Sequence, residues 1–129
     1  MSKPLAWVIE DDPDLAEIFS LALRGGGFET EIFRDGRAAD ERLAGTPPAV
    51  IVLDLHLPHV RGTTLMEKIY QDKRFERTAV IITTADAQEA DRLRSRADLV
   101  LLKPVSIDQL RELAKRMLHR WQATADSSS

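Results

Sequence analysis

The sequence predicts one doubly wound α/β domain, in which helices cover both faces of a five-stranded parallel sheet. Short apolar runs typical of buried strands alternate five times with amphipathic helical patterns. The connections between successive strands are short, as right-handed helical crossovers require. The chain has 129 residues, which is an ordinary size for a single domain.

The first strand and the first helix have clear boundaries in the sequence. The apolar run Leu5–Ile9 predicts a buried strand, and it ends abruptly at an acidic segment. Asp12 followed by Pro13 is typical of a helix start, because aspartate caps the first backbone N–H groups and proline fits the first helical position. Apolar residues then recur at helical spacing until the glycines at 25–27 end the helix.

The next three elements differ in their expected exposure. The segment Phe28–Phe33 alternates apolar and polar residues, which is typical of a half-exposed strand near a sheet edge. The segment Asp35–Leu43 is a weaker helical pattern followed by turn residues. The segment Ala49–Leu53 is the strongest continuous apolar run, and it therefore predicts a central strand covered on both faces.

The second half of the chain repeats this alternation. A helical stripe of apolar residues covers Leu65–Tyr70, and two further buried strands are predicted at Ala79–Ile82 and Leu99–Leu102. Between these strands, Ala87–Arg96 has a helical composition with few apolar residues. Apolar residues in Ile107–Trp121 mark one face of a long last helix.

Composition and charge exclude several functional classes. The net charge of −3 argues against a direct nucleic-acid partner bound by broad phosphate neutralisation, and the basic residues of the last helix complement its dipole. The absence of cysteine excludes a disulfide scaffold, a thiolate zinc site and a cysteine nucleophile. No apolar run has the roughly 20 residues of a membrane helix, so we expect a cytoplasmic domain with no membrane partner. We expect this domain to span residues 1–122, and the small, polar segment 123–129 to be a flexible tail or linker stub.

Charged and hydroxyl residues follow the predicted strands at their carboxyl ends. Glu10 and Asp11 end the first strand, and the third, fourth and fifth strands end at Asp54, Thr84 and Lys103. Ligand sites of doubly wound sheets lie beyond these strand ends, so we expect the five side chains to converge. Carboxylates about 4 Å apart in a partly buried site repel one another by several kcal/mol, which a single lysine does not offset. The sequence therefore predicts a divalent cation, and Mg²⁺ suits a site with few carboxylates.

This arrangement has a chemical use in phosphoryl transfer. A carboxylate such as Asp54 can accept a phosphoryl group to give an acyl phosphate if a metal ion, a lysine and hydrogen-bond donors neutralise the phosphoryl oxygens. Mg²⁺, Lys103 and the Thr84 hydroxyl would supply these three. Taken singly, each residue has a simpler explanation, as a helix cap, a turn residue or an ordinary polar residue after a strand. Their joint placement at four strand ends favours a shared site.

Four motifs follow one another in a recognisable order, and they are Val8–Pro13, Val52–Pro58 with Gly62, Ile82–Ala85 and Lys103-Pro104. Through these motifs, the chain resembles the receiver domain of bacterial two-component response regulators from residue 5 to about residue 121. The resemblance implies the flavodoxin-like, CheY-like strand order 2-1-3-4-5. It also implies a signalling phosphoacceptor rather than an enzyme, one that assists its own phosphorylation and dephosphorylation.

The resemblance implies a role for each residue of the site. Asp54 resembles the phosphoacceptor, Thr84 the switch hydroxyl that moves toward the phosphoryl group, and Lys103 the lysine that pairs with the phosphate. The resemblance also implies a cis peptide bond between Lys103 and Pro104. The implied Mg²⁺ ligands are Asp11 directly, Glu10 through water, Asp54 and the backbone carbonyl of His56.

The resemblance also implies the class of partner. The phosphoryl donor would be a phosphohistidine of a sensor histidine kinase or of a histidine phosphotransfer protein. The sequence does not indicate the downstream protein partner or output domain, and a phosphorylation-dependent homodimer is one alternative assembly. The alternative function is a phosphorylation-independent module with the receiver fold that binds proteins through the last helix. A phosphatase of the haloacid dehalogenase type would need a second aspartate where His56 stands, and we set it aside.

Three features depart from the family pattern. Val100 occupies the position of the usual Tyr or Phe three residues before the lysine, so the aromatic residue that reports phosphorylation is missing. The stretch from Thr84 to Lys103 is shorter than usual by roughly one helical turn, and Arg96 stands where a glycine is common. We interpret these departures as an altered output surface on a site that keeps its phosphoryl chemistry. Ordinary drift within a tolerant helix is the alternative.

Two further residues flank the expected site. His56 and Asp86 lie two positions beyond Asp54 and Thr84. A contact between them would raise the pKa of His56 and would screen an acyl phosphate from water. The alternative is that both are solvated loop residues.

Overall fold

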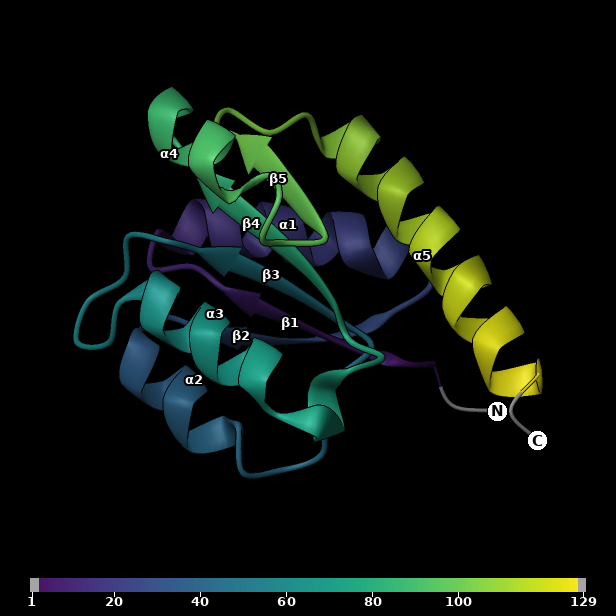
Figure 1. The fold of residues 1–129 in the computed structure, drawn as a ribbon. Helices are drawn as coiled ribbons and strands as arrows, with labels where there is room; N and C mark the ends of the chain where they lie inside the picture. Colours follow the sequence, from purple (N-terminus) through teal and green to yellow (C-terminus); the bar gives the residue numbers. More distant parts are fainter. Residues whose placement is uncertain (1–2, 128–129) are drawn as a thin grey trace.

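The computed structural model describes residues 3–127, with side chains to residue 123, and it places a parallel sheet between two layers of helices (Figure 1). The strands are β1 (Leu5–Ile9), β2 (Glu29–Phe33), β3 (Val50–Asp54), β4 (Ala79–Thr84) and β5 (Leu99–Leu102). The helices are α1 (Pro13–Gly25), α2 (Gly36–Arg42), α3 (Gly62–Gln71), α4 (Ala87–Leu93) and α5 (Ile107–Ser127), with a short 3-10 helix η1 (Lys73–Phe75). All five predicted strands are confirmed to within two residues at each end.

The order of the strands in the sheet is β2-β1-β3-β4-β5, and every neighbouring pair is parallel. This confirms the order that the resemblance implied. As expected, β2 is an edge strand, and β3 lies in the middle of the sheet with all its residues buried. The register pairs Asp54 at the end of β3 with Thr83 of β4, so the carboxyl ends of these two strands meet at one edge.

The sheet separates two hydrophobic cores, because alternate side chains of each strand point to opposite faces. Trp7 and Ile9 of β1 pack on the face that α2, α3 and α4 cover. Ala6 and Val8 of the same strand pack on the face that α1 and α5 cover. Trp7 is fully buried between two aromatic rings, with edge contacts to Phe33 and Phe75.

The helix starts follow the predicted capping chemistry. The Asp12 carboxylate accepts hydrogen bonds from the backbone N–H groups of Asp14 at 2.9 Å and of Leu15 at 3.2 Å. Pro13 is the first helical residue of α1, as predicted. The chain leaves α1 through Gly27, whose φ of 106° lies in the left-handed region that glycine adopts without strain.

Two helices end elsewhere than the sequence pattern indicated. α4 ends at Leu93, and the residues to Arg96 form a turn, so the prediction of a helix over Ala87–Arg96 was too long. α5 continues to Ser127 and so extends into the segment expected to be a tail. The flexibility of that segment stays a prediction, and its last two residues lie outside the described part of the chain.

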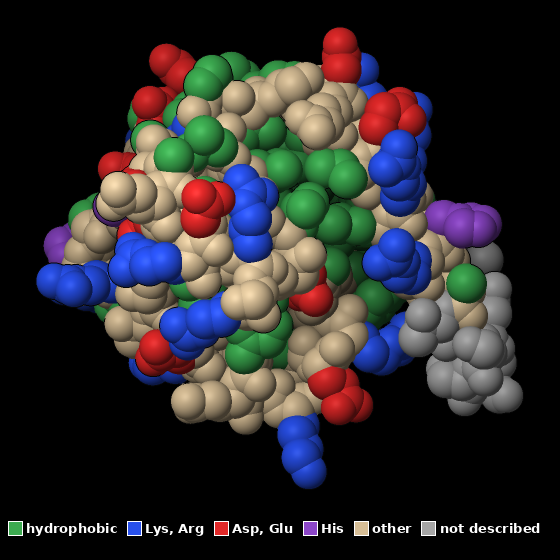
Figure 2. Space-filling model, turned by 45° about the horizontal axis from the view of Figure 1, so that its top comes forward, with side chains coloured by type: hydrophobic (Ala, Val, Ile, Leu, Met, Phe, Trp, Pro, Cys, Tyr) green, Lys and Arg blue, Asp and Glu red, His purple; other side chains and the backbone are tan. Residues whose placement is uncertain are grey.

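The surface over α4, β5 and α5 faces the viewer in Figure 2. Hydrophobic side chains gather in the middle of this view, and Lys and Arg side chains lie on both sides of them. Leu102 at the end of β5 contributes to the exposed apolar surface of the protein. Within residues 3–127, no helix has both the length and the apolar character needed to cross a membrane.

Candidate functional site

Three charged side chains meet at the carboxyl edge of the sheet. Glu10 follows β1, Asp54 ends β3, and both are almost completely buried, with 1% and 3% of their surface exposed. Lys103, which follows β5, reaches between them. Its Nζ atom lies 2.8 Å from Glu10 Oε1 and 3.4 Å from Asp54 Oδ2. The structure therefore brings together residues that are up to 93 positions apart in the chain.

One lysine does not neutralise these carboxylates. Burial raises the pKa of Glu10 from its ordinary 4.5 to about 7; the hydrogen bond from Lys103 opposes this rise, and the charge of Asp54 adds to it. Burial tends to lower the pKa of Lys103, but the hydrogen bond to Glu10 and the charge of Asp54 outweigh burial and raise it. The site thus holds more negative charge than its single ammonium group balances.

The donor set fits a hard divalent cation. Glu10, Asp11 and Asp54 each offer a carboxylate oxygen, and these oxygens lie within 4.8 Å of one another. Asp11 is exposed, so the cluster opens to solvent on its side. Oxygen ligands combined with solvent access suit Mg²⁺, which keeps several of its waters when it binds to proteins.

The loop after β3 is fixed tightly around Asp54. The backbone N–H of His56 donates to Asp54 Oδ1 at 3.1 Å, whereas Lys103 approaches the other carboxylate oxygen, Oδ2. Gly62 at the start of α3 packs directly against this loop. A Cβ atom at Gly62 would lie 2.5 Å from the backbone oxygen of Asp54 and from Leu55 Cα, so only glycine fits there.

Thr84, at the end of β4, is fully buried beside Glu10 and Asp54 on the same sheet edge, but its hydroxyl points to a different partner. It donates to Glu89 Oε1 at 2.8 Å. The same Glu89 oxygen lies 3.2 Å from His56 Nε2. The predicted contact between His56 and Asp86 was therefore wrong, because the Asp86 carboxylate caps α4 by accepting from two backbone N–H groups of its first turn.

Sequence reasoning missed Glu89. A signal was present, because Asp86 followed three residues later by Glu89 is the pattern of a capping box at a helix start. That pattern indicated a glutamate close to the end of β4. It did not indicate that the carboxylate would turn toward Thr84 and His56.

Two other expectations can be compared with the structure. The peptide bond between Lys103 and Pro104 is cis, as the resemblance implied. Val100 is buried in the core on the α4 side of the sheet, where its small side chain packs among apolar neighbours. A core valine therefore occupies the position at which the resemblance implied an aromatic residue.

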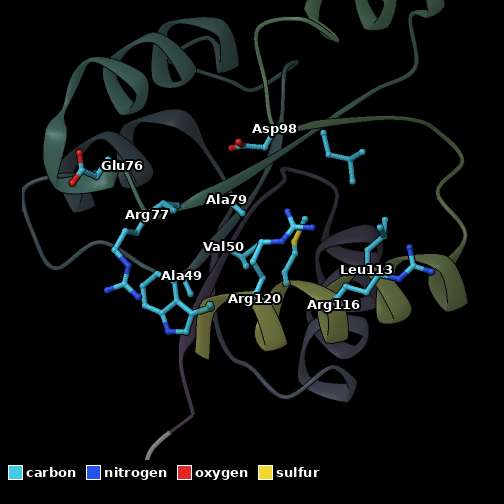
Figure 3. Close-up of a pocket in the computed structure, with 13 residues that line it drawn as sticks. Ala49, Val50, Glu76, Arg77, Ala79, Asp98, Leu113, Arg116 and Arg120 are labelled. Atoms are coloured by element: carbon cyan, nitrogen blue, oxygen red, sulfur yellow. The ribbon is translucent and has the colours of Figure 1, made fainter. Parts of the chain in front are cut away.

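A cavity of about 480 Å³ lies away from this site, between α5 and the beginnings of β3, β4 and β5 (Figure 3). Val50 and Leu113 contribute to its apolar lining, and Arg77, Arg116 and Arg120 surround it together with the acidic residues Glu76 and Asp98. The guanidinium of Arg77 stacks 4.3 Å above the ring of Trp121. Because Val50 begins the strand that Asp54 ends, the cavity and the carboxylates lie at opposite ends of the sheet.

Known proteins share both the sequence pattern and the fold. Residues 6–115 match the profile of the response regulator receiver domain. The phosphate regulon transcriptional regulatory protein PhoB of Rhizobium meliloti is 33% identical over 120 residues, which cover 91% of this chain and 53% of that protein. The chain spans about half the length of the curated relatives that it matches.

Solved structures agree with this assignment. The receiver domain of a LuxO repressor protein from Vibrio parahaemolyticus superposes with a TM-score of 0.84 at 26% identity, and the match covers 98% of each chain. The receiver domain of sensor histidine kinase PA1611 from Pseudomonas aeruginosa PAO1, solved with a magnesium ion in its active-site cleft, has the same fold, with a TM-score of 0.79 at 23% identity over 92% of this chain and 99% of that one. The strand order, the match over 110 consecutive residues and these superpositions lead to one conclusion. The chain belongs to the response regulator receiver domain family of two-component systems.

Proposed function

We propose that this receiver domain accepts a phosphoryl group on Asp54 in a reaction that depends on Mg²⁺. The observation that carries the proposal is the environment of the Asp54 carboxylate. It is buried, it is held by the His56 N–H and by Lys103, and it lies beside the carboxylates of Glu10 and Asp11. Such a site favours the binding of a cation and of a phosphoryl group whose oxygens the cation neutralises.

The reaction is a displacement at phosphorus. An oxygen of the Asp54 carboxylate attacks the phosphorus atom of a phosphohistidine, the P–N bond breaks, and the histidine nitrogen leaves with its electron pair and is protonated. The product is an acyl phosphate on Asp54. Lys103 Nζ is 3.4 Å from the Asp54 carboxylate, so it is close enough to form an ion pair with the phosphoryl oxygens of the product.

Mg²⁺ would be held by the carboxylates of Asp11 and Asp54 and by the backbone carbonyl of His56, with Glu10 acting through water. When bound, the ion supplies charge neutralisation for the phosphoryl oxygens. The close approach of Gly62 keeps the loop that carries the His56 carbonyl next to Asp54. The raised pKa of Glu10 supports this assignment, because burial and the charge of Asp54 disfavour the ionised carboxylate and a bound cation would favour it.

The partners follow from this chemistry. We infer that the donor is a sensor histidine kinase or a histidine phosphotransfer protein, acting in the cytoplasm. Phosphorylation would change the binding of a downstream protein or of an output domain. An output domain is considered because the relatives are about twice as long as this chain. The downstream protein or output domain would then recognise the phosphorylated state through the surface near the site, which includes α4.

The test is direct phosphorylation in solution. The protein is incubated with acetyl phosphate and Mg²⁺, and intact mass is measured for the gain of one phosphoryl group. We expect the gain in the wild type, and its loss in Asp54→Asn and in the presence of EDTA. Asp14→Asn is the matched control, since Asp14 is an exposed aspartate in the first turn of α1 and outside the carboxylate cluster. An unmodified wild type, or a phosphoryl group retained in Asp54→Asn, would refute the proposal.

A further inference from the structure

We propose that Glu89 is a positioning residue that holds the unphosphorylated arrangement of the site and links it to the first turn of α4. This inference rests on the function proposed above for Asp54. It concerns one carboxylate that joins three segments of the chain, namely the end of β4, the loop after β3 and the start of α4.

Glu89 turns its carboxylate inward. Its oxygen Oε1 accepts the Thr84 hydroxyl at 2.8 Å and lies 3.2 Å from His56 Nε2. The Glu89 side chain is only 16% exposed, whereas the His56 side chain that meets it is 64% exposed. An acidic residue in the first turn of a short surface helix would ordinarily extend into water, so its inward position reflects these two contacts.

Thr84 in turn supports the start of α4. Its hydroxyl oxygen accepts a hydrogen bond from the backbone N–H of Asp86 at 3.1 Å. In an ordinary capping box the glutamate side chain accepts directly from the N–H of the capping residue. Here the Thr84 hydroxyl stands between Asp86 N–H and the Glu89 carboxylate, so the first turn of α4 depends on where that hydroxyl points.

A phosphoryl group on Asp54 would compete for the same hydroxyl. Thr84 has one proton to donate, and Glu89 uses it in this structure. Phosphoryl oxygens are strong acceptors, and they would also be repelled by the Glu89 carboxylate. Binding them therefore requires Thr84 to release Glu89, and this release removes support from the first turn of α4. The change at Asp54 reaches the helix through polar contacts, without an aromatic ring at Val100.

The first experiment measures the rate of phosphorylation by acetyl phosphate with Mg²⁺ at saturating donor. Removing the competing acceptor should accelerate the reaction, and the net strength of one hydrogen bond corresponds to roughly three- to tenfold. We expect this acceleration for Glu89→Ala and a smaller one for Glu89→Gln, which keeps an acceptor oxygen without the charge. Gln88→Ala is the matched control, because Gln88 is an exposed neighbour in the same turn, and it should leave the rate unchanged.

A second pair of variants separates the proposed route from a general loosening of α4. In a Thr84→Val background the hydroxyl is absent, so Glu89→Ala should then change the rate less than about twofold. Equal acceleration in both backgrounds would mean that Glu89 acts through its charge or through helix stability rather than through the Thr84 hydroxyl, and it would overturn the inference. So would an unchanged rate in Glu89→Ala.

Hydrogen exchange provides an independent measurement on the helix. Beryllofluoride with Mg²⁺ should accelerate exchange of the N–H groups in the first turn of α4 in the wild type, and Glu89→Ala should exchange fast before it is added. If beryllofluoride leaves the exchange rate of α4 unchanged in a protein that becomes phosphorylated, this inference is overturned and the proposed function of Asp54 stands. A wild type that gains no phosphoryl group at all would instead refute the proposed function.

Discussion

The buried carboxylate of Glu10 makes the stability of the metal-free protein depend on pH in a defined direction. Its pKa is about 7 in the folded protein, against an ordinary value of 4.5. Between these two pH values the folded state retains a proton that the unfolded state has lost. By linkage, the free energy of unfolding therefore falls as the pH rises from about 4.5 to about 7. At 1.36 kcal/mol for each pH unit, the full loss is about 3 kcal/mol.

The assay is urea unfolding in EDTA at several pH values between about 4.5 and 8. Other groups titrate in this range, so the informative quantity is the difference in unfolding free energy between the wild type and Glu10→Gln, which cannot ionise at this position. We expect the wild type to lose about 3 kcal/mol relative to the variant across this range. Screening by water does not reduce this figure much, because Glu10 is 1% exposed.

The control is Glu41→Gln, which removes an exposed carboxylate on α2. Its unfolding free energy should run parallel to that of the wild type at all pH values. Parallel curves for the wild type and Glu10→Gln would refute the reasoning, because they would show that Glu10 is ionised equally in the folded and unfolded states.

Three further predictions follow from other features. The protein has one tyrosine, Tyr70, whose hydroxyl donates to Asp98 Oδ2 at 3.0 Å. Because partial burial and the charge of Asp98 raise the pKa of Tyr70 to about 12, its near-ultraviolet absorbance should titrate well above the ordinary value of 10, and a midpoint at 10 would contradict this. Gly62→Ala should destabilise the protein by about 1–3 kcal/mol in urea unfolding, because the added Cβ meets backbone. Gly25→Ala, where the Cβ meets only the flexible Arg111 side chain, should cost much less, and equal losses would argue against a tight loop at Asp54. Helix α4 should be the least protected helix in hydrogen exchange, and protection equal to that of α5 would contradict this.

Much of the fold was predictable because burial patterns are local. The continuous apolar run before Asp54 required a strand covered on both faces, and β3 is that strand. The convergence of Glu10, Asp54 and Lys103 followed from the geometry of parallel sheets, in which all strands end at one edge. Periodicity does not encode which strands are neighbours, so the strand order came from the resemblance.

The details of the site depend on distances that no local pattern contains. Whether His56 would meet Asp86 or Glu89 was decided by the hydrogen bonds that occupy the Asp86 carboxylate at the start of α4. The pKa of Glu10 depends on how completely the surrounding residues exclude water, which is a property of the assembled fold. The end of α4 at Leu93 was missed because the following residues keep a helical composition while forming a turn.

The division of the interior by the sheet has a consequence for how the domain can move. α4 contributes two buried side chains, Ala90 and Leu93, to its core, and burying such a pair stabilises by only about 2–4 kcal/mol. α1 and α5 pack against each other on the opposite face, around a separate set of apolar residues. A displacement of α4 would therefore disturb one side of the molecule at small energetic cost, while the other side remained a rigid support.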